Sequence, residues 1–199
     1  MPDNEIQQHV AELREALSAL APQDMSDAGR QLLDCYDREA TLYLVGNGGS
    51  AATASHFACD LSKGTRQPGV PRFRAVALTD NVPLMTAWGN DASFDRIFAE
   101  QLIPLVRPHD LLLAISASGN SPNALEAVRS ARDAGASTMA WTGPTGGSLA
   151  DLVDTVIRVP AGPIEQVEDA HMVLAHALTV FIRARLRARS REGARASGH

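Results

Sequence analysis

The stretch LLLAISASGNSPN, residues 111–123, determines the fold that we expect for this chain. Residues 111–115 form a short continuous apolar run, which is typical of a strand buried on both faces of a sheet. Residues 123–134 have the apolar spacing of a helix, and Gly135 follows as a helix end. The stretch therefore predicts a buried strand, a polar turn and a helix, in that order.

The polar turn carries three serines around a Gly-Asn corner: Ser116, Ser118 and Ser121. A helix that begins after such a turn directs backbone N–H groups and a partial positive charge toward it, which favours an anion. The turn contains no lysine, so it is not a Walker-type phosphate loop. An ordinary serine-capped turn is the alternative, but three hydroxyls at one corner favour a phosphate site.

Strands and helices alternate through most of the chain. This alternation predicts an α/β fold with a five-stranded parallel sheet and right-handed crossovers, in the flavodoxin-like order 2-1-3-4-5. Two helices, at residues 6–20 and 26–38, precede the first strand and are expected to cover the sheet or pair with another subunit. The expected strands are 41–45, 75–78, 110–115, 138–141 and 154–159, and the other helices lie at 51–63, 81–105 (two, broken near 89–90), 123–134 and 165–186.

A second polar loop, Gly-Asn-Gly-Gly-Ser at residues 46–50, follows the first strand. In the expected order the first and third strands are neighbours, and the loops after them diverge at the switch point where ligands of open α/β sheets bind. The glycines do not have the GxGxxG spacing, so a dinucleotide is not favoured. Both loops together predict a crevice for a phosphate ester.

Composition is that of a globular protein of 199 residues with a net charge of −5. We expect one domain over residues 1–186, with N-terminal helices at 1–39 and the α/β core and last helix at 40–186, and then a basic flexible tail at 187–199. No signal peptide or membrane span of about 20 apolar residues is visible. Cys35 and Cys59 are not in a CxxC motif, which favours reduced, buried thiols in a cytoplasmic protein.

Six arginines and one glutamate lie between residues 183 and 195, so the C-terminal region is strongly basic. Such a segment could touch nucleic acid. Basic residues also favour the C-terminal end of a helix, and a solvated helix end is the commoner reason for them. We therefore expect neither a nucleic-acid partner nor a membrane partner.

Histidines and carboxylates recur on two of the predicted helices. His56 and Asp60 are four residues apart and share a helix face. Glu168 and His176 are eight residues apart on the last helix, which places them about 80° apart around its axis. Two imidazoles and two carboxylates could bind a zinc-like ion or act as an acid/base set without metal. The alternative is a polar helix face toward solvent or a subunit contact, and we favour it for His171.

Together these motifs resemble the sugar isomerase (SIS) domain family and, within it, the isomerases of sedoheptulose 7-phosphate. The resemblance runs from the N-terminal helices to about Leu186. It implies the SIS fold, a homotetramer, and an enediol reaction that converts sedoheptulose 7-phosphate to D-glycero-D-manno-heptose 7-phosphate. The motifs that carry it are Gly46–Ser50 with His56, Gly89–Asp91, Ile115–Ser121, Thr142–Gly143 and the helix with Glu168 and His176.

The resemblance also implies roles for individual residues. Asp60 and His176 would be the catalytic pair. A zinc ion, where present, would be held by His56, Asp60, Glu168 and His176. The phosphorylated sugar would contact Asn47, Gly48, Gly49, Ser50, Asp91, Ser116, Ala117, Ser118, Asn120, Ser121 and Glu168.

Three positions depart from the family pattern: Asp60 replaces the usual Glu, Glu168 the usual Gln, and Ala117 a common Thr. These departures leave a second interpretation open, in which the protein is a non-catalytic SIS protein that binds phosphosugars or a protein partner, as regulators of replication initiation do. Histidines at 56 and 176, with acidic residues facing them, favour the enzyme, because a pure scaffold would not need that arrangement.

Overall fold

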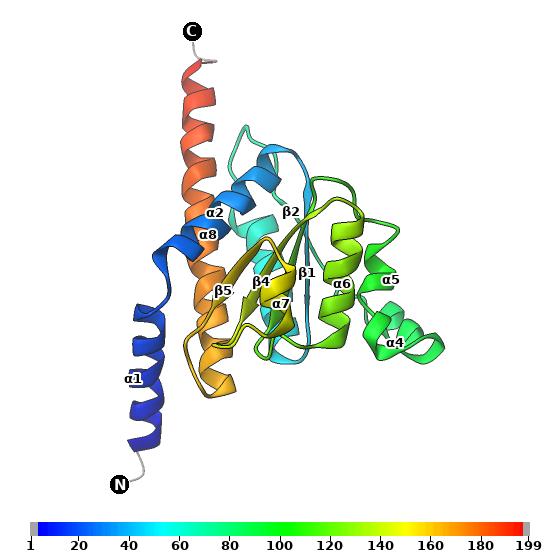
Figure 1. Ribbon diagram of the computed structural model, residues 1–199. Coiled ribbons are helices and arrows are strands. Elements are labelled where there is room, and N and C mark those ends of the chain that lie inside the picture. The colour runs from blue at the N-terminus through cyan, green and yellow to red at the C-terminus, as the bar shows by residue number, and fades with distance from the viewer. Residues whose placement is uncertain (1–3, 197–199) are drawn as a thin grey trace.

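The computed structural model describes residues 4–196 and contains one five-stranded parallel sheet (Figure 1). The order is β2-β1-β3-β4-β5, which confirms the predicted topology. Gly46 pairs with Ile115, so β1 and β3 end at the same level and their following loops leave the sheet side by side. The strands are β1 (Thr41–Gly46), β2 (Arg74–Ala77), β3 (Leu111–Ser116), β4 (Ser137–Thr142) and β5 (Thr155–Arg158).

Helices cover both faces of this sheet. One face packs against α2 (Pro22–Asp37), α3 (Gly49–Cys59) and the long α8 (Ile164–Ala196), with α1 (Asn4–Ser18) outside them. The other face packs against α5 (Ala99–Leu102), α6 (Pro122–Asp133) and α7 (Gly147–Leu152). Three further segments complete the described chain: α4 (Val82–Asp91), a π-helical turn (Asp60–Gly64) and a 3-10 turn (Phe94–Arg96).

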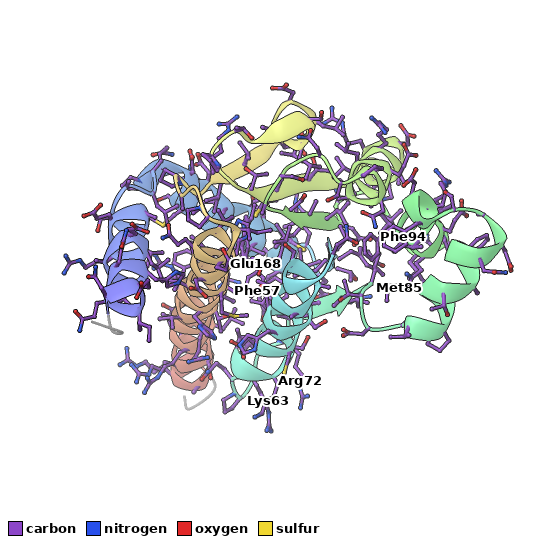
Figure 2. All side chains as sticks on the ribbon, turned by 90° about the horizontal axis from the view of Figure 1, so that it is seen from below. Phe57, Lys63, Arg72, Met85, Phe94 and Glu168 are labelled. Atoms are coloured by element: carbon purple, nitrogen blue, oxygen red, sulfur yellow. The ribbon has the colours of Figure 1, made fainter. Side chains whose placement is uncertain are left out.

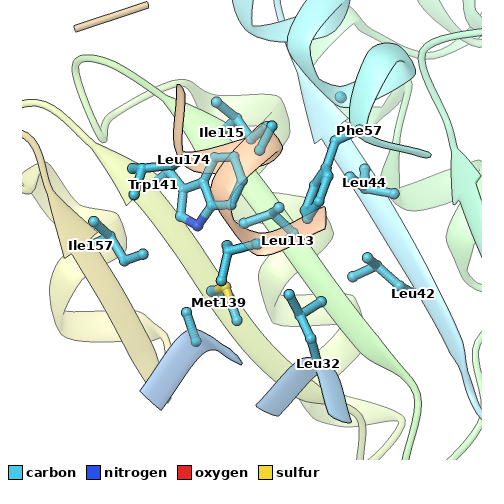
Figure 3. Packing of buried hydrophobic residues seen from close by; sticks show 14 of the residues in the cluster. Leu32, Leu42, Leu44, Phe57, Leu113, Ile115, Met139, Trp141, Ile157 and Leu174 are labelled. Atoms are coloured by element: carbon cyan, nitrogen blue, oxygen red, sulfur yellow. The ribbon is translucent and has the colours of Figure 1, made fainter. Parts of the chain in front are cut away.

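The core is divided by the sheet because successive side chains of a strand point to opposite faces. On β1, Leu42 and Leu44 belong to the cluster beneath α2, α3 and α8, whereas Val45 belongs to the cluster beneath α5 and α6. The Phe57 ring of α3 lies 5.3 Å from the Trp141 ring of β4, centroid to centroid (Figure 3). Burial of such side chains contributes about 1.5–3 kcal/mol each, so this face fixes α3 and α8 on the sheet.

The apolar residues of α1 lie on two different surfaces. Leu13 and Leu17 pack against the core of their own chain, so this part of α1 covers the sheet, which is one of the two roles expected for the first helices. Ile6 and Val10 are 70% and 61% exposed. Pro22 occupies the first turn of α2, where its missing N–H costs nothing.

The segment after β2 differs from the prediction. Helix α4 continues through Gly89 and Asn90 to Asp91 and breaks only at Ser93, whose backbone is extended. One glycine inside a helix costs only about 1 kcal/mol, which does not stop the helix. No residue of α4 is buried, and Figure 2 shows this helix standing away from the body of the protein.

The C-terminal region also differs from the prediction, because α8 continues as a helix to Ala196 and does not give way to a flexible tail at residue 187. Leu186 is buried, Arg189 forms an ion pair with Asp37, and the Ser190 hydroxyl donates to the Pro68 carbonyl. These contacts hold the basic part of the helix against the body. Residues 197–199 lie outside the described part of the chain.

The two cysteines differ in exposure. Cys35 is buried as expected, but Cys59 is exposed, because it lies on the outer side of α3.

None of the helices between residues 4 and 196 is long and apolar enough to cross a membrane.

Candidate active site

The two polar loops are tied together at the carboxyl ends of β1 and β3. The Asn47 amide nitrogen donates to the Asn123 amide oxygen at 2.8 Å, and the Asn123 amide nitrogen donates back at 2.9 Å. Asn123 is only 1% exposed. This reciprocal pair fixes the crevice between the loops. Both polar atoms of the Asn47 side chain are hydrogen-bonded to Asn123.

The serine loop, residues 116–121, gathers its three hydroxyls around Ser116. The Ser116 Oγ lies 3.1 Å from the Ser121 Oγ and 3.4 Å from the Ser118 Oγ. Helix α6 begins at Pro122, directly after the loop, so its N-terminal end points toward the hydroxyls. This is the geometry that favours an anion such as a phosphate.

The serine loop also accepts hydrogen bonds from backbone N–H groups of the segment that follows β4. The Gly143 N–H donates to the Ala117 carbonyl at 2.9 Å, and the Ser148 N–H donates to the Asn120 amide oxygen at 2.9 Å. Gly119 has a φ of +66°, and a Cβ atom there would lie 2.0 Å from the Gly146 carbonyl oxygen. These contacts restrict the loop, and the Asn120 side chain is used to hold it, because its amide nitrogen also donates to the Ser118 carbonyl.

The first loop lies beside α8. Gly48 has a φ of +55° and precedes α3. A Cβ atom on Gly49 would lie 2.3 Å from the Glu168 Oε2, so the Glu168 carboxylate is packed against the first turn of α3 (Figure 2). Negative charge is favourable at a helix N-terminus, and Glu168 therefore occupies the anion position of this loop. Ser50, in the same turn, is buried.

A cavity of about 380 Å³ opens between the first loop and α4. Its walls are mostly apolar and include Met85, Phe94 and Gly89 (Figure 2). Asp91 lies two residues beyond Gly89 at the exposed end of α4, where its carboxylate accepts a hydrogen bond from the Asn90 amide at 2.8 Å. No hydrogen bond or ion pair joins the Asp91 side chain to the loops in the described chain.

Two imidazoles and a carboxylate meet between α3 and α8. The Nε2 atoms of His56 and His176 lie 2.9 Å apart, and the Asp60 Oδ2 lies 3.5 Å and 3.9 Å from them, respectively. Their ligand atoms all lie within 4.8 Å of one another, which suits one metal ion. Among the described residues this group holds three donors, and Glu168 is not one of them. Three protein ligands would leave a position open for substrate or water.

Asp60 lies where α3 changes into the π-helical turn Asp60–Gly64. Such turns are rare and occur often at functional sites. The wider turn starts at Asp60, one helical turn after His56, so the carboxylate still shares the helix face of His56. The apolar spacing of residues 51–63 does not distinguish a π turn from an α-helix, so this turn could not be predicted from the sequence.

His171 is fully buried, although its sequence position suggested a solvent or subunit face. Its Nε2 lies 3.3 Å from the Thr142 carbonyl oxygen. Burial lowers its pKa to about 4, and the bond to Thr142 opposes that shift only in part. The side chain is therefore neutral at pH 7.

The fold and this site define a class: an α/β protein of flavodoxin-like strand order, with serine hydroxyls and a helix N-terminus at its switch point and a His–Asp–His group between α3 and α8. The chain belongs to the SIS domain family, whose model matches residues 6–143. That match ends before α8, so it does not include Glu168 or His176.

Similar proteins extend over nearly the whole chain. A phosphoheptose isomerase of Bradyrhizobium sp. is 37% identical over 92% of this chain and 95% of its own length. That of Mycobacterium tuberculosis is 40% identical over 77% of this chain and 78% of its own. The solved structure of phosphoheptose isomerase GmhA from Neisseria gonorrhoeae superposes with a TM-score of 0.85 at 32% identity, covering 92% of this chain and 100% of that one.

Proposed function

We propose that the protein is an isomerase that converts sedoheptulose 7-phosphate to D-glycero-D-manno-heptose 7-phosphate. The observation that carries this proposal is the meeting of Asp60 with His176, from two helices separated by more than 100 residues, beside a loop built for phosphate. The relatives that cover most of the chain at 35–40% identity are phosphoheptose isomerases, which supports the same reaction.

The phosphate would bind at the serine loop, on the hydroxyls of Ser116, Ser118 and Ser121 and the end of α6. The first turn of α3 is the other helix N-terminus at the crevice, but the Glu168 carboxylate repels an anion there. His56 follows Gly49 by seven residues, roughly 10 Å along α3 at 1.5 Å per residue. That separation favours an extended sugar whose phosphate and carbonyl lie at opposite ends of the site.

Conversion of a ketose to an aldose moves a proton from C1 to C2 through an enediol. The Asp60 carboxylate would take the C1 proton and return it to C2, and His176 would move a proton between the oxygens on C1 and C2. Both side chains are accessible, because Asp60 is 28% and His176 54% exposed. Asn47, Gly48 and Ser50 would shape the wall of the crevice, and Asp91 would contact sugar hydroxyls if α4 moved toward the loops.

A zinc ion fits the donor set of His56, Asp60 and His176, since zinc binds imidazole nitrogen and carboxylate oxygen. When bound, it would supply Lewis-acid polarisation of the sugar carbonyl and stabilise negative charge on the enediol oxygens. Glu168 would become a fourth ligand only if its carboxylate left the first turn of α3.

We also propose that the protein is a homo-oligomer, a tetramer as the family resemblance implies. Val173 and Val180 are 42% and 59% exposed and share the helix face of His176. Ile6 and Val10 add exposed apolar surface on α1. A second copy that covers this face would exclude water from the acid/base group. Both cysteines are free thiols, which supports a cytoplasmic location.

The competing function is that of a phosphosugar-binding regulator without catalysis. The experiment that separates the two is incubation with five-, six- and seven-carbon ketose phosphates, with the appearance of an aldose phosphate followed by NMR. We expect turnover that is fastest on the seven-carbon substrate. Tight binding of these compounds with no aldose formed, with or without added zinc, would support the regulator and reject the isomerase.

A further inference from the structure

His171 lies on α8, the helix that carries His176, and connects this helix to the serine loop without belonging to the acid/base group. It lies three residues after Glu168 and five before His176, and none of its side chain is exposed. Its Nε2 lies 3.3 Å from the carbonyl oxygen of Thr142, the last residue of β4. A carbonyl oxygen can only accept, so Nε2 carries the proton and donates.

The peptide group that His171 contacts also forms a hydrogen bond with the serine loop. The Thr142 carbonyl and the Gly143 N–H belong to the same planar peptide group. That N–H donates to the Ala117 carbonyl in the middle of the serine loop at 2.9 Å. The orientation of one peptide plane therefore links α8 to the loop that carries Ser116 and Ser118.

The Gly143 backbone and the serine loop are packed closely, so neither can shift far relative to the other. A Cβ atom on Gly143 would lie 2.6 Å from the Ala117 carbonyl oxygen, so the two backbones are in close contact. The Thr142 carbonyl also accepts a hydrogen bond from the Val159 N–H, which follows β5, at 2.9 Å. The second hydrogen bond to this carbonyl comes from the His171 side chain on α8.

We propose that His171 is a positioning residue, which holds the serine loop in its phosphate-binding conformation through the Thr142–Gly143 peptide. The inference rests on the proposed function, because it concerns how the same site binds phosphate. Among the described residues the one hydrogen bond of the His171 side chain is to the Thr142 carbonyl, so it has none with the acid/base group. Its effect is on the affinity for the phosphate group and not on proton transfer.

The test compares His171→Leu, which removes the donor, with His171→Gln, whose amide nitrogen restores one. Thr179→Val is the matched control, because Thr179 is another buried polar residue of α8 and its hydroxyl has no hydrogen-bond partner among the described residues. The three readouts are amide hydrogen exchange of Gly143, the dissociation constant for inorganic phosphate, and the separate values of kcat and KM.

For His171→Leu we expect faster exchange at Gly143, about tenfold weaker phosphate binding, which is the scale of one lost hydrogen bond, and a raised KM with little change in kcat. His171→Gln should recover most of each value, and Thr179→Val should leave all three unchanged. If His171→Leu does not fold, Gly143→Ala disturbs the same link from the loop side and should weaken phosphate binding in the same way.

Unchanged Gly143 exchange in His171→Leu would overturn the inference whatever the activity is. Equal loss in His171→Leu, His171→Gln and Thr179→Val would also overturn it, because the effect would then be general destabilisation. A wild-type protein that binds neither phosphate nor sugar phosphate would instead overturn the proposed function, and the inference with it. The exchange measurement keeps these failures apart.

Discussion

The Nε2 atoms of His56 and His176 lie 2.9 Å apart. At that distance one imidazole must donate its proton and the other must accept it. A metal ion bound by both nitrogens needs both lone pairs, so it must replace this hydrogen bond. The pair is thus a site at which a metal competes with a proton.

Zinc binding should depend on Asp60 and not on Glu168. Asp60→Asn should weaken zinc binding by more than about tenfold, since it removes a charged donor, whereas Glu168→Gln should change it little because that carboxylate lies against Gly49. Competition with a chromophoric chelator measures both, and affinity should fall in acid as protons compete for the imidazoles. His109→Ala, an exposed histidine elsewhere, is the control. A larger loss in Glu168→Gln would place Glu168 in the coordination sphere.

Phosphate affinity should depend on the serine hydroxyls. In Ser118→Ala combined with Ser121→Ala, the dissociation constant for a sugar phosphate should rise at least about tenfold, because hydrogen bonds to a charged group contribute about 1.5–3 kcal/mol each. Calorimetric titration measures the change. Ser137→Ala at the exposed start of β4 should bind normally. Normal binding by the double variant would remove the phosphate from this loop.

The Asn47–Asn123 pair should stabilise the fold as a unit. Asn123→Ala leaves the Asn47 amide without its two partners, and we expect a loss of about 1–3 kcal/mol in the free energy of unfolding. In a double-mutant cycle by urea denaturation, the two alanine substitutions should show a coupling of at least about 0.5 kcal/mol. Strictly additive losses would contradict the reciprocal pair.

Acid should destabilise the protein through His171. Its pKa is about 4 in the folded state against an ordinary 6.5. Between these values the unfolded chain binds a proton that the folded chain does not, so stability falls as the pH is lowered through this window. The loss from this group between pH 7 and pH 5 should be about 2 kcal/mol. The cause is burial, and no charged neighbour contributes.

Urea denaturation of the wild type and of His171→Gln at both pH values checks this assignment. The variant cannot take up the proton, so its stability should depend less on pH over this window. Equal pH dependence in the two proteins would show that another group is responsible.

The sheet and its two loops could be predicted from the sequence because each rests on local patterns. Buried strands such as Leu111–Ser116 are continuous apolar runs, and the alternation with helices allows few topologies. Once the order is known, the meeting of residues 46–50 with residues 116–121 follows from the switch point. The contact between His56 and Asp60 likewise follows from helix spacing.

The remaining features depend on long-range packing that no local pattern encodes. The Glu168 carboxylate lies at Gly49 because α8 runs beside α3 from its first turn, and helix spacing alone could not separate it from His176. The burial of His171 depends on the position of Thr142 at the end of β4. The helical extension to Ala196 depends on contacts with Asp37 and Pro68, which lie far away in the sequence.

The most direct test of the central claim is proton exchange during turnover. The protein is incubated with sedoheptulose 7-phosphate in heavy water, and the formation of the aldose heptose phosphate is followed by NMR together with deuterium at C1 and C2. We predict aldose formation, with deuterium at these carbons to the extent that the proton on Asp60 exchanges with solvent; both are abolished in Asp60→Asn and in His176→Ala and unchanged in His109→Ala. A wild-type protein that binds the substrate yet forms no aldose and introduces no deuterium at C1 or C2, with zinc present or absent, would contradict the assignment of Asp60 and His176 as the acid/base pair of an isomerase.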